Sequence, residues 1–309
     1  MKFSVAICTW NRAELLDRTL ASLCRLRASD QEPWEIVLVD NNCTDRTGDV
    51  VGKYADRLPL RLVREMRQGH SFARNRAVEH CRGEIVVWTD DDVVVDEDWL
   101  QHYRSLIDRT AEASFWGGPI RPKFDAERPD WLVANWKTCQ GCFAVRDLGT
   151  EVFELTADRL PYGANFAVRT GVQRQFHFDE NRGRKAHSLV GDEELDVMRR
   201  MIAGGHRGFW VPQAGVEHLI PVERMTLDYV RRYFIGQGRR LAASGQSQHR
   251  SAGSWSREAF IQRSLFRLKY RFAKSPAWLA HWIRAALAEG QRQGLEDSAT
   301  APANVEPRQ

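Results

Sequence analysis

Three consecutive carboxylates follow a short apolar run at residues 85–89, which reads Ile-Val-Val-Trp-Thr. A run of this length and composition is typical of a buried strand in a parallel sheet. Asp90, Asp91 and Asp92 stand at its carboxyl end, where their charges repel one another unless a positive group lies beside them. Ligands bind open α/β sheets at this edge, and Mg²⁺ is commonly held by one or two carboxylates together with substrate phosphates. We therefore expect a cation and a phosphate group here; the alternative is a solvated acidic turn.

The segments around this run alternate between strand-like and helix-like patterns. The expected strands are 3–9, 35–39, 60–63 and 85–89, and the expected helices are 13–26, 46–54, 71–80 and 97–108. This order predicts an α/β fold with a doubly wound, mostly parallel sheet and right-handed crossovers. The chain lacks the G-x-G-x-x-G motif of dehydrogenases and the P-loop of ordinary ATPases, so both classes are disfavoured.

The remainder of the chain is less regular. Residues 121–160 carry several prolines and no clear period, and a loop of this length is usually functional. Further strands are expected at 115–119, 165–168, 209–211 and 215–218, and further helices at 191–202, 226–243 and 255–288, the last broken near Pro276. Residues 245–254 resemble a flexible linker, and residues 293–309 form a polar tail that we expect to be disordered.

Composition is that of a globular protein. The chain has 309 residues, 43% of them hydrophobic, yet no apolar stretch reaches the roughly 18 residues that a membrane-spanning helix needs. The first residues lead directly into strand-like sequence, so we expect no signal peptide and a cytoplasmic location. Six cysteines fit reduced thiols, and the single C-x-x-C pair, Cys139 and Cys142, lacks the second pair that a zinc site requires.

Charge is distributed unevenly along the chain. Residues 223–292 contain fourteen Lys and Arg against four Asp and Glu, a net charge of +10, whereas the whole chain carries +4. Within residues 255–288 the basic side chains are interleaved with Phe and Trp in a helical pattern, which is typical of peripheral contact with a membrane surface. The alternative is a helix that packs its apolar face on the preceding domain. No nucleic-acid motif accompanies the charge, so we expect no nucleic-acid partner.

Six short motifs, in the same order and at similar spacing, resemble family 2 glycosyltransferases. They are residues 8–12 (T-Y-N-R in the family), 39–47 (V-D-N-N-S-T-D-x-T), 69–77 (G-x-x-x-A-R-N-x-A), 89–92 (D-x-D), 163–169 (G-A-N-F-A-x-R) and 191–195 (E-D-x-E-L). The resemblance spans about residues 3–220. It implies a GT-A fold, in which a Rossmann-like nucleotide-binding half is merged with an acceptor-binding half.

We divide the chain accordingly. Residues 1–222 form the expected GT-A domain, with a nucleotide-binding half at 1–110 and an acceptor half at 111–222. Residues 223–292 form a basic, amphipathic helical extension, and residues 293–309 form the tail.

The resemblance implies an inverting enzyme that moves a sugar from a nucleoside-diphosphate sugar, with UDP favoured, to the hydroxyl of a saccharide or lipid-linked acceptor. Such enzymes act in bacterial surface polysaccharide or glycolipid assembly, here on the inner face of the plasma membrane if the basic helices contact it. Two alternatives stay open. One is a sugar nucleotidyltransferase, although the glycine-rich loop expected after its first strand is absent, and the other is a non-catalytic nucleotide- or carbohydrate-binding relative.

A divalent cation, Mn²⁺ or Mg²⁺, is implied by the D-x-D element. The resemblance assigns Asp92 to the metal, and Asp90 to the ribose and the metal. Asp91 would share the donor site, with an exposed turn as its alternative. His218, at the end of the last expected strand, is a further metal candidate, although a histidine in the core or a loop is the competing interpretation.

Polar residues of the first motifs are the implied nucleotide-sugar contacts. They are Thr9, Asn11, Arg12, Asp40, Arg74 and Asn75, in addition to Asp90 and Asp91. Asp40 would bond the nucleotide base or, alternatively, cap a turn. Arg74 would lie near the diphosphate, since its planar fork suits phosphate; an ordinary arginine on a helix surface is the alternative.

The acceptor hydroxyl must lose its proton as it attacks, and a carboxylate in hydrogen-bond reach serves this purpose. The resemblance points to Asp192, with Glu193 as the alternative base because Gly191 stands where the family often has Glu. Both carboxylates would also complement the positive end of the helix that they begin. Asn165 and Trp131 are acceptor-side candidates, together with Trp136 and Trp210, although tryptophans are more often core residues.

Overall fold

The computed structural model of the chain describes residues 2–27, 33–180, 191–243, 245, 250–270 and 278–300. They form two compact units. The first comprises residues 2–125, 143–180 and 191–220, and the second comprises 126–142 and the described residues from 221 onward. The predicted boundary after residue 222 lies beside the junction at residue 220. Residues 126–142, which the sequence places in the acceptor half, cluster instead with the C-terminal helices.

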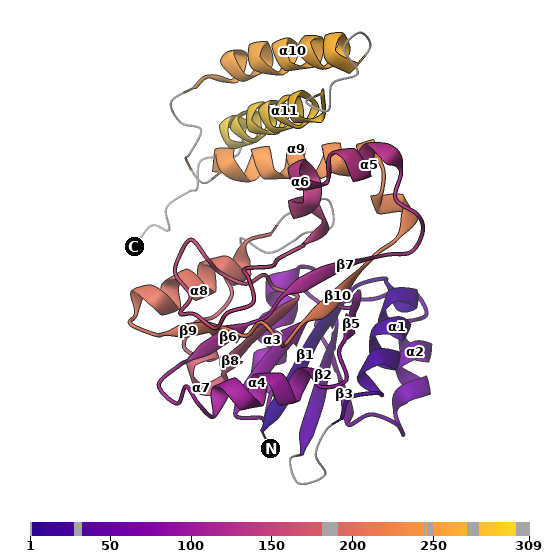
Figure 1. Ribbon diagram of the computed structural model, residues 1–309, viewed down its shortest axis with the longest axis vertical. Helices are drawn as coiled ribbons and strands as arrows, with labels where there is room; N and C mark the ends of the chain where they lie inside the picture. Colours follow the sequence, from indigo (N-terminus) through magenta and orange to yellow (C-terminus); the bar gives the residue numbers. More distant parts are fainter. Residues whose placement is uncertain are drawn as a thin grey trace, which may run out of the picture. The chain divides into compact units, whose positions relative to one another are not determined.

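A seven-stranded sheet forms the centre of the first unit (Figure 1). Its strands, in spatial order, are β3 (Leu60–Arg64), β2 (Trp34–Asp40), β1 (Phe3–Thr9), β4 (Ile85–Thr89), β8 (Asn165–Arg169), β6 (Phe115–Gly117) and β9 (Gly208–Trp210). The first four strands are parallel. β8 runs antiparallel to β4 and β6, and β9 is parallel to β6. The predicted mixed α/β architecture with a mostly parallel sheet is confirmed.

Helices cover both faces of this sheet. They are α1 (Ala13–Leu23), α2 (Thr47–Tyr54), α3 (His70–His80), α4 (Trp99–Ile107), α7 (Thr170–Gln173) and α8 (Glu193–Ala203). Because successive side chains of a strand point to opposite faces, Val5 and Val87 pack with α1, α2 and α4, whereas Ala6 and Val86 pack with α3 and α8. Burial on both faces explains why these strands read as continuous apolar runs.

A smaller sheet of three strands continues from the end of β4. It contains β5 (Val93–Val95), β10 (Val216–Ile220) and β7 (Ile120–Phe124), with β10 in the middle. β10 is antiparallel to β5, and the register pairs His218 with Val93. This pairing brings the histidine beside the carboxylates that precede β5. The strand β7 was not expected within 121–160, because its alternate side chains are exposed and its sequence lacks a clear apolar period.

The second unit is helical in the residues that the structure describes. It contains α5 (Asp130–Ala134), α6 (Trp136–Cys139), the 3₁₀ turns η1 (Gln140–Phe143, whose last residue belongs to the first unit) and η2 (Val222–Arg224), and the helices α9 (Leu227–Ala243), α10 (Ala252–Leu268) and α11 (Trp278–Thr300). α11 packs against both α9 and α10. None of the described helices has the length and apolar content needed to cross a membrane.

The prediction that a disordered tail begins at residue 293 is wrong. α11 continues to Thr300, because Gly294 fits closely against Arg239 and Ala242 of α9. Packing of this kind stabilises a helix whose sequence is polar. Residues 246–249 of the expected linker, the expected break near Pro276 and residues 301–309 lie outside the described residues. The helix α10 begins at Ala252, within the expected linker range.

Candidate active site

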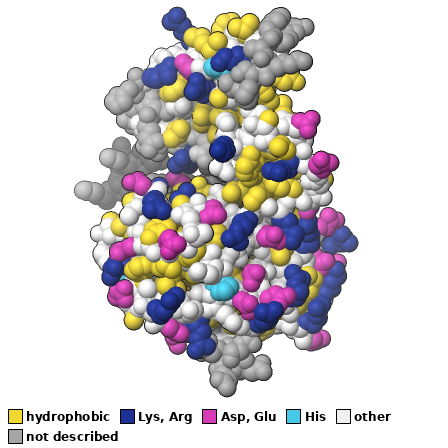
Figure 2. All heavy atoms as spheres, in the orientation of Figure 1, with side chains coloured by type: hydrophobic (Ala, Val, Ile, Leu, Met, Phe, Trp, Pro, Cys, Tyr) yellow, Lys and Arg dark blue, Asp and Glu magenta, His cyan; other side chains and the backbone are white. Residues whose placement is uncertain are grey.

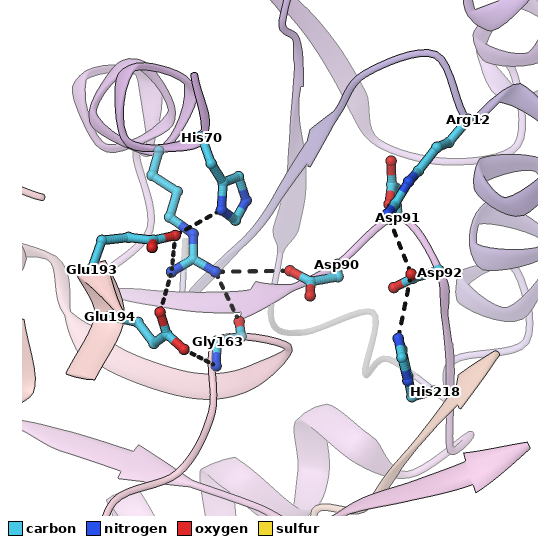
Figure 3. Close-up of polar contacts among 10 residues, drawn as sticks. Arg12, His70, Asp90, Asp91, Asp92, Gly163, Glu193, Glu194 and His218 are labelled. Atoms are coloured by element: carbon cyan, nitrogen blue, oxygen red, sulfur yellow. Dashed lines mark hydrogen bonds and ion pairs between the residues drawn. The ribbon is translucent and has the colours of Figure 1, made fainter. Parts of the chain in front are cut away.

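The three carboxylates diverge at the end of β4, because the chain turns at Asp91 and Asp92 before β5 begins. Figure 3 shows Asp90 on one side of this turn, and Asp91 and Asp92 on the other. Two groups of polar residues therefore flank the strand end. The Arg12 group comprises Thr9, Arg12, Asp91, Asp92 and His218. The Arg74 group comprises His70, Arg74, Asp90, Gly163, Glu193 and Glu194.

The guanidinium of Arg12 faces two buried carboxylates. Arg12 NH1 donates hydrogen bonds to Asp91 Oδ1 at 2.9 Å and to Asp92 Oδ2 at 3.1 Å, and the Thr9 hydroxyl donates to Asp91 Oδ2 at 2.7 Å. Burial raises the pKa of Asp91 even though Arg12 opposes the shift. The charge of Asp91 in turn raises the pKa of Arg12. Asp91 is thus a buried partner of Arg12, and the exposed-turn alternative is excluded.

His218 completes this group from β10. Its Nε2 lies 3.3 Å from Asp92 Oδ2, and its Nδ1 lies 2.8 Å from the carbonyl oxygen of Phe143. Since a carbonyl oxygen only accepts, Nδ1 carries the hydrogen and Nε2 is directed at the carboxylate. Histidines that bind metals usually donate their second ring N–H in this way.

The donor set of Asp92 and His218 fits a divalent cation that takes its remaining ligands from a substrate phosphate. Within the described residues there is no group of three or more His, Cys, Asp or Glu arranged to hold a metal ion. Asp90 does not join the pair, because it faces Arg74 at 3.8 Å. The structure therefore brings together two of the three predicted metal ligands.

Arg74 forms the centre of the second group. Its side chain is only 3% exposed, which excludes the alternative of an ordinary arginine on a helix surface. The guanidinium lies 5.2 to 5.9 Å from the ring centres of Trp88, Phe166 and Phe178. Burial opposes its charge, but the surrounding carboxylates raise the pKa of Arg74. NH1 makes no hydrogen bond to another described residue, but it faces Glu193 Oε1 at 3.7 Å and Glu194 Oε2 at 3.9 Å.

Two adjacent glutamates at the start of α8 complete the Arg74 group, and their pKa values are shifted in opposite directions. Glu193 Oε1 lies 2.7 Å from His70 Nδ1 and 3.7 Å from Arg74 NH1. Burial opposes ionisation of Glu193, but the hydrogen bond from His70 and the charge of Arg74 lower its pKa. Burial and the neighbouring charge of Glu193 raise the pKa of Glu194, whose Oε1 accepts the N–H of Gly163 at 3.2 Å.

These positions distinguish the two candidate bases. Glu193 is 2% exposed, is bonded to His70 and has a lowered pKa, which makes it a weak and inaccessible base. Asp192 directly precedes α8 and is 8% exposed. The alternative role of Glu193 as the base is therefore disfavoured, and we assign Glu193 to holding His70 and Arg74.

The loops after β1 and β2 hold each other at the same edge of the sheet. Asn11 adopts a positive φ of 51°, and its side-chain oxygen accepts the N–H of Thr44 at 2.7 Å. Asp40 accepts the N–H of Cys43 at 2.7 Å, as expected of the turn residue that was its alternative role. Asp40 Oδ2 faces Arg64 Nε at 4.0 Å. Both predicted nucleotide contacts therefore take part in loop structure.

Two predicted ligand contacts have structural roles instead. Asn75 clamps Phe178 through both side-chain atoms, each at 2.9 Å from the Phe178 backbone. Asn165 is fully buried, and its amide bonds side chains of α4 and two backbone carbonyls. Both N–H groups and both acceptor positions of the Asn165 amide are therefore occupied, which corrects the expectation that Asn165 binds the acceptor.

The tryptophan and cysteine predictions have mixed outcomes. Trp131 is half-buried in α5 of the second unit, whereas Trp210 is a fully buried core residue. All six cysteines are free, and burial raises the pKa of Cys139 to about 11.

Sequence reasoning missed His70, Glu194 and the close packing at Gly163. A Cβ on Gly163 would lie 2.4 Å from Arg74 NH2 and 3.2 Å from Glu194 Cδ. All three residues lie inside the recognised motifs, which was the available signal. Their roles depend on contacts such as His70 with Glu193, which are 123 residues apart and have no local pattern.

Comparison with known proteins identifies the family. Residues 4–160, half of the chain, match the family model described as glycosyl transferase family 2. The glucosyl-dolichyl phosphate glucuronosyltransferase of Haloferax volcanii is 29% identical over 250 residues, which cover 78% of this chain and 77% of that protein. The succinoglycan biosynthesis protein ExoM of Rhizobium meliloti is 25% identical over 259 residues, covering 78% and 76%.

Solved structures share the fold. Residues 1–349 of S. aureus TarS, in complex with UDP-GlcNAc, give a TM-score of 0.57 at 17% identity, covering 99% of this chain and 93% of that one. The mannosyltransferase PcManGT of Pyrobaculum calidifontis, in complex with GDP-Man and Mn²⁺, gives 0.54 at 20% identity, covering 98% and 76%. The chain therefore belongs to glycosyl transferase family 2 and is a glycosyltransferase with the GT-A fold.

Proposed function

We propose that this glycosyltransferase moves a sugar, with inversion, from a nucleoside-diphosphate sugar to a hydroxyl of a saccharide or lipid-linked acceptor. The observation that carries the proposal is the pair of charged groups at the end of β4, one around Arg12 and one around buried Arg74. A diphosphate with its counter-ion fits such a site, because Arg74 supplies positive charge and Asp92 with His218 supplies ligands. UDP is the favoured nucleotide, as in the TarS complex with UDP-GlcNAc.

The transfer is a single displacement. Asp192 takes the proton of the acceptor hydroxyl while that oxygen bonds the anomeric carbon and the bond to the diphosphate breaks. Attack from the face opposite the leaving group inverts the anomeric carbon. Asp90 lies toward the ribose and Asp40 toward the base, whereas Arg74 balances charge that grows on the diphosphate. Residues 1–110 would hold the donor, and residues 111–222 would contribute the acceptor side.

Asp92 and His218 would hold the divalent cation, Mn²⁺ or Mg²⁺. A bound cation supplies charge stabilisation to the departing diphosphate. PcManGT was solved with Mn²⁺ and GDP-Man, which supports the choice of metal. Arg12 would keep Asp91 and Asp92 in place, since it bonds both carboxylates.

Thermal unfolding with UDP, GDP and dTDP, each with and without Mn²⁺, tests the donor site. A ligand that binds only the native state stabilises it by about 2.7 kcal/mol at a hundredfold excess over Kd. We expect one diphosphate to raise the melting temperature in a Mn²⁺-dependent manner. Asp92→Ala should abolish the Mn²⁺-dependent part, whereas Asp158→Ala, an exposed control, should not.

Asp192→Asn separates catalysis from binding. This variant should retain the thermal shift and lose sugar transfer by at least about a hundredfold, the factor typical of a general base. Absence of any shift at millimolar diphosphate would contradict the donor site. A wild-type shift without transfer or donor hydrolysis would favour the non-catalytic binding relative. Formation of nucleotide-sugar from a nucleoside triphosphate and a sugar phosphate would favour the nucleotidyltransferase.

We also infer peripheral contact with an anionic membrane surface through residues 255–288. α10 packs one face on α11, where Gln262 bonds His281 at 2.6 Å. The other face leaves Phe260 71% and Leu268 57% exposed. Exposed Arg257 and Arg267 lie on the same helix, and Figure 2 shows hydrophobic and basic side chains adjacent at the top of the view, where Figure 1 places α10.

An anionic bilayer fits the combination of exposed apolar and basic side chains on this face. Apolar side chains of an amphipathic helix enter the headgroup boundary, and Lys and Arg bind anionic lipid. The net charge of +10 over residues 223–292 adds a long-range attraction. Such contact would place the enzyme on the inner face of the plasma membrane, within reach of a lipid-linked acceptor.

A further inference from the structure

His70 is an accessible histidine attached to a buried carboxylate in the Arg74 group. Its Nδ1 lies 2.7 Å from Glu193 Oε1, and the two side chains are 24% and 2% exposed. We propose that His70 binds the transferred sugar, with its Nε2 accepting a hydrogen bond from a hydroxyl of that sugar. This inference rests on the proposed function, because it assigns a contact within the donor site.

The contact with Glu193 determines which ring nitrogen is available. An ionised carboxylate only accepts hydrogen bonds, and the lowered pKa of Glu193 keeps it ionised. His70 Nδ1 must therefore carry a hydrogen, and in the neutral form of the ring the lone pair lies on Nε2. Figure 3 shows Nδ1 turned to Glu193 and Nε2 turned away from it. The contact with Glu193 thus sets the tautomer and the orientation of the ring.

Burial shows which part of the group a ligand reaches first. Arg74 and Glu193 are 3% and 2% exposed, whereas His70 is 24% and Asp90 is 28% exposed. The imidazole and Asp90 are therefore the accessible edges of a group in which Arg74 and Glu193 are enclosed. A neutral acceptor atom at such an edge suits a sugar hydroxyl, which is a good hydrogen-bond donor without charge.

Two helix starts bring this edge to the start of α8, directly after the proposed base. His70 is the first residue of α3, directly after Gly69, whose φ of 147° allows the chain to turn there. Glu193 is the first residue of α8 and follows Asp192, the proposed base. On the other side, Arg74 faces Asp90 at 3.8 Å. His70 thus lies between the residues that we assign to ribose and diphosphate and the helix that begins at the base.

A competing explanation is that His70 only balances the charge of buried Glu193. Two substitutions separate the explanations, because each places an amide group where one of the two ring nitrogens was. In His70→Asn the side-chain amide occupies the place of Nδ1 and still bonds Glu193. In His70→Gln the terminal amide occupies the place of Nε2 and loses that bond.

The experiment is calorimetric titration of the wild type, His70→Asn and His70→Gln with UDP-, GDP- and dTDP-sugars and the matching diphosphates, with Mn²⁺ present. We expect His70→Asn to bind the nucleotide-sugar roughly tenfold more weakly, the factor that one neutral hydrogen bond supplies, and to bind the diphosphate unchanged. His70→Gln should keep most of the preference for the nucleotide-sugar. His102→Asn, a histidine of α4 outside the site, is the control.

The outcomes are distinct. If His70→Asn binds both ligands like the wild type, or loses affinity for both equally, His70 has only a structural role and the inference is overturned. If His70→Asn has a lower melting temperature that accounts for its weaker binding, the role of His70 is likewise only structural. If the wild type binds no nucleotide-sugar at all, the proposed function fails together with this inference.

Discussion

At the scale of the residue, the carboxylates at the end of β4 have different roles although they are adjacent in sequence. Asp90 faces Arg74, Asp91 bonds Thr9 and Arg12, and Asp92 lies between Arg12 and His218. One cationic residue on each side therefore shares the negative charge, which would otherwise destabilise a buried cluster. Each of these carboxylates therefore has a cationic neighbour before any ligand arrives, but Arg12 alone faces both Asp91 and Asp92.

Gly163→Ala should damage the Arg74 group from the backbone side. Its Cβ would lie 2.4 Å from Arg74 NH2, and the guanidinium cannot move freely because three aromatic rings surround it. We expect a loss of about 1–3 kcal/mol in the free energy of unfolding, as in overpacked cores, and weaker diphosphate binding. Gly171→Ala is the matched control, since nothing lies within 4 Å of its Cβ. Equal melting temperatures and affinities for both variants would contradict the prediction.

Glu194→Gln should make stability less sensitive to pH. Burial and the charge of Glu193 raise the pKa of Glu194 in the folded protein, so the folded state keeps a proton that the unfolded state loses. The free energy of unfolding therefore falls as pH rises from the unfolded pKa toward the folded one. Gln cannot ionise and still accepts the N–H of Gly163.

We expect the melting temperature of Glu194→Gln, relative to the wild type, to increase between pH 4.5 and pH 8. Differential scanning calorimetry over this range measures it, with Glu14→Gln, an exposed carboxylate, as the control. A difference that stays constant or decreases with pH would show that Glu194 is ionised in the folded protein at all these values.

At the scale of the element, the site is assembled by strand register and helix starts. The pairing of His218 with Val93 places the imidazole beside Asp92, although the two side chains come from strands far apart in the sequence. α3 and α8 begin at His70 and Glu193, and these two residues bond each other. Rigid elements thus hold the polar side chains that the loops alone would leave loose.

The α9–α11 pair depends on glycines at its crossing. A Cβ on Gly290 would lie 2.1 Å from the carbonyl oxygen of Ile235, and a Cβ on Gly238 would lie 2.2 Å from that of Leu287. Because backbone atoms cannot give way cheaply, Gly290→Ala should lower the free energy of unfolding by about 1–3 kcal/mol, despite the better helix propensity of Ala.

Gly52→Ala in α2 is the matched control, for which we expect a change of opposite sign in the free energy of unfolding. Nothing lies within 4 Å of its Cβ, so propensity alone should stabilise the protein by up to about 1 kcal/mol. Chemical denaturation of both variants measures the difference. Stabilisation by Gly290→Ala would mean that α9 and α11 do not approach closely in solution.

At the scale of the whole molecule, the site residues and the basic helices with exposed apolar side chains lie in different parts of the chain. The first unit carries the site residues, and the second carries the basic helices with exposed Phe260 and Leu268. This separation is what the membrane proposal uses, because a catalytic unit and an attachment surface then occupy different parts of the chain. It also means that attachment and donor binding are testable independently.

The full chain should co-sediment with vesicles of phosphatidylcholine and phosphatidylglycerol and not with phosphatidylcholine alone, since basic side chains need anionic lipid. The combined variant Phe260→Ser and Leu268→Ser should weaken this binding at least about tenfold, because each buried CH₂ contributes about 0.8 kcal/mol. Met66→Ser, 68% exposed in the first unit, is the control. Equal binding of neutral vesicles, or a change only in oligomeric state, would show that the face binds something other than anionic lipid.

The sequence by itself determined the fold class and the edge of the sheet at which the site lies. Alternating strand and helix patterns have few topological solutions, and polar residues that follow parallel strands must meet at one edge. The order of the six motifs then pointed to the family. The predictions of fold and family are confirmed, because each depends on local pattern or on the order of elements along the chain.

Only the tertiary structure decided what each of these side chains contacts. Asn165 lies in the core, Asn75 clamps a loop, and Glu193 is bound to His70, although all three belong to motifs. Polar side chains of the same type and spacing bind either a ligand or the protein itself, depending on residues that packing brings from tens to more than a hundred positions away. That competition is settled by burial and by hydrogen bonds between distant elements, for which the local sequence has no signal.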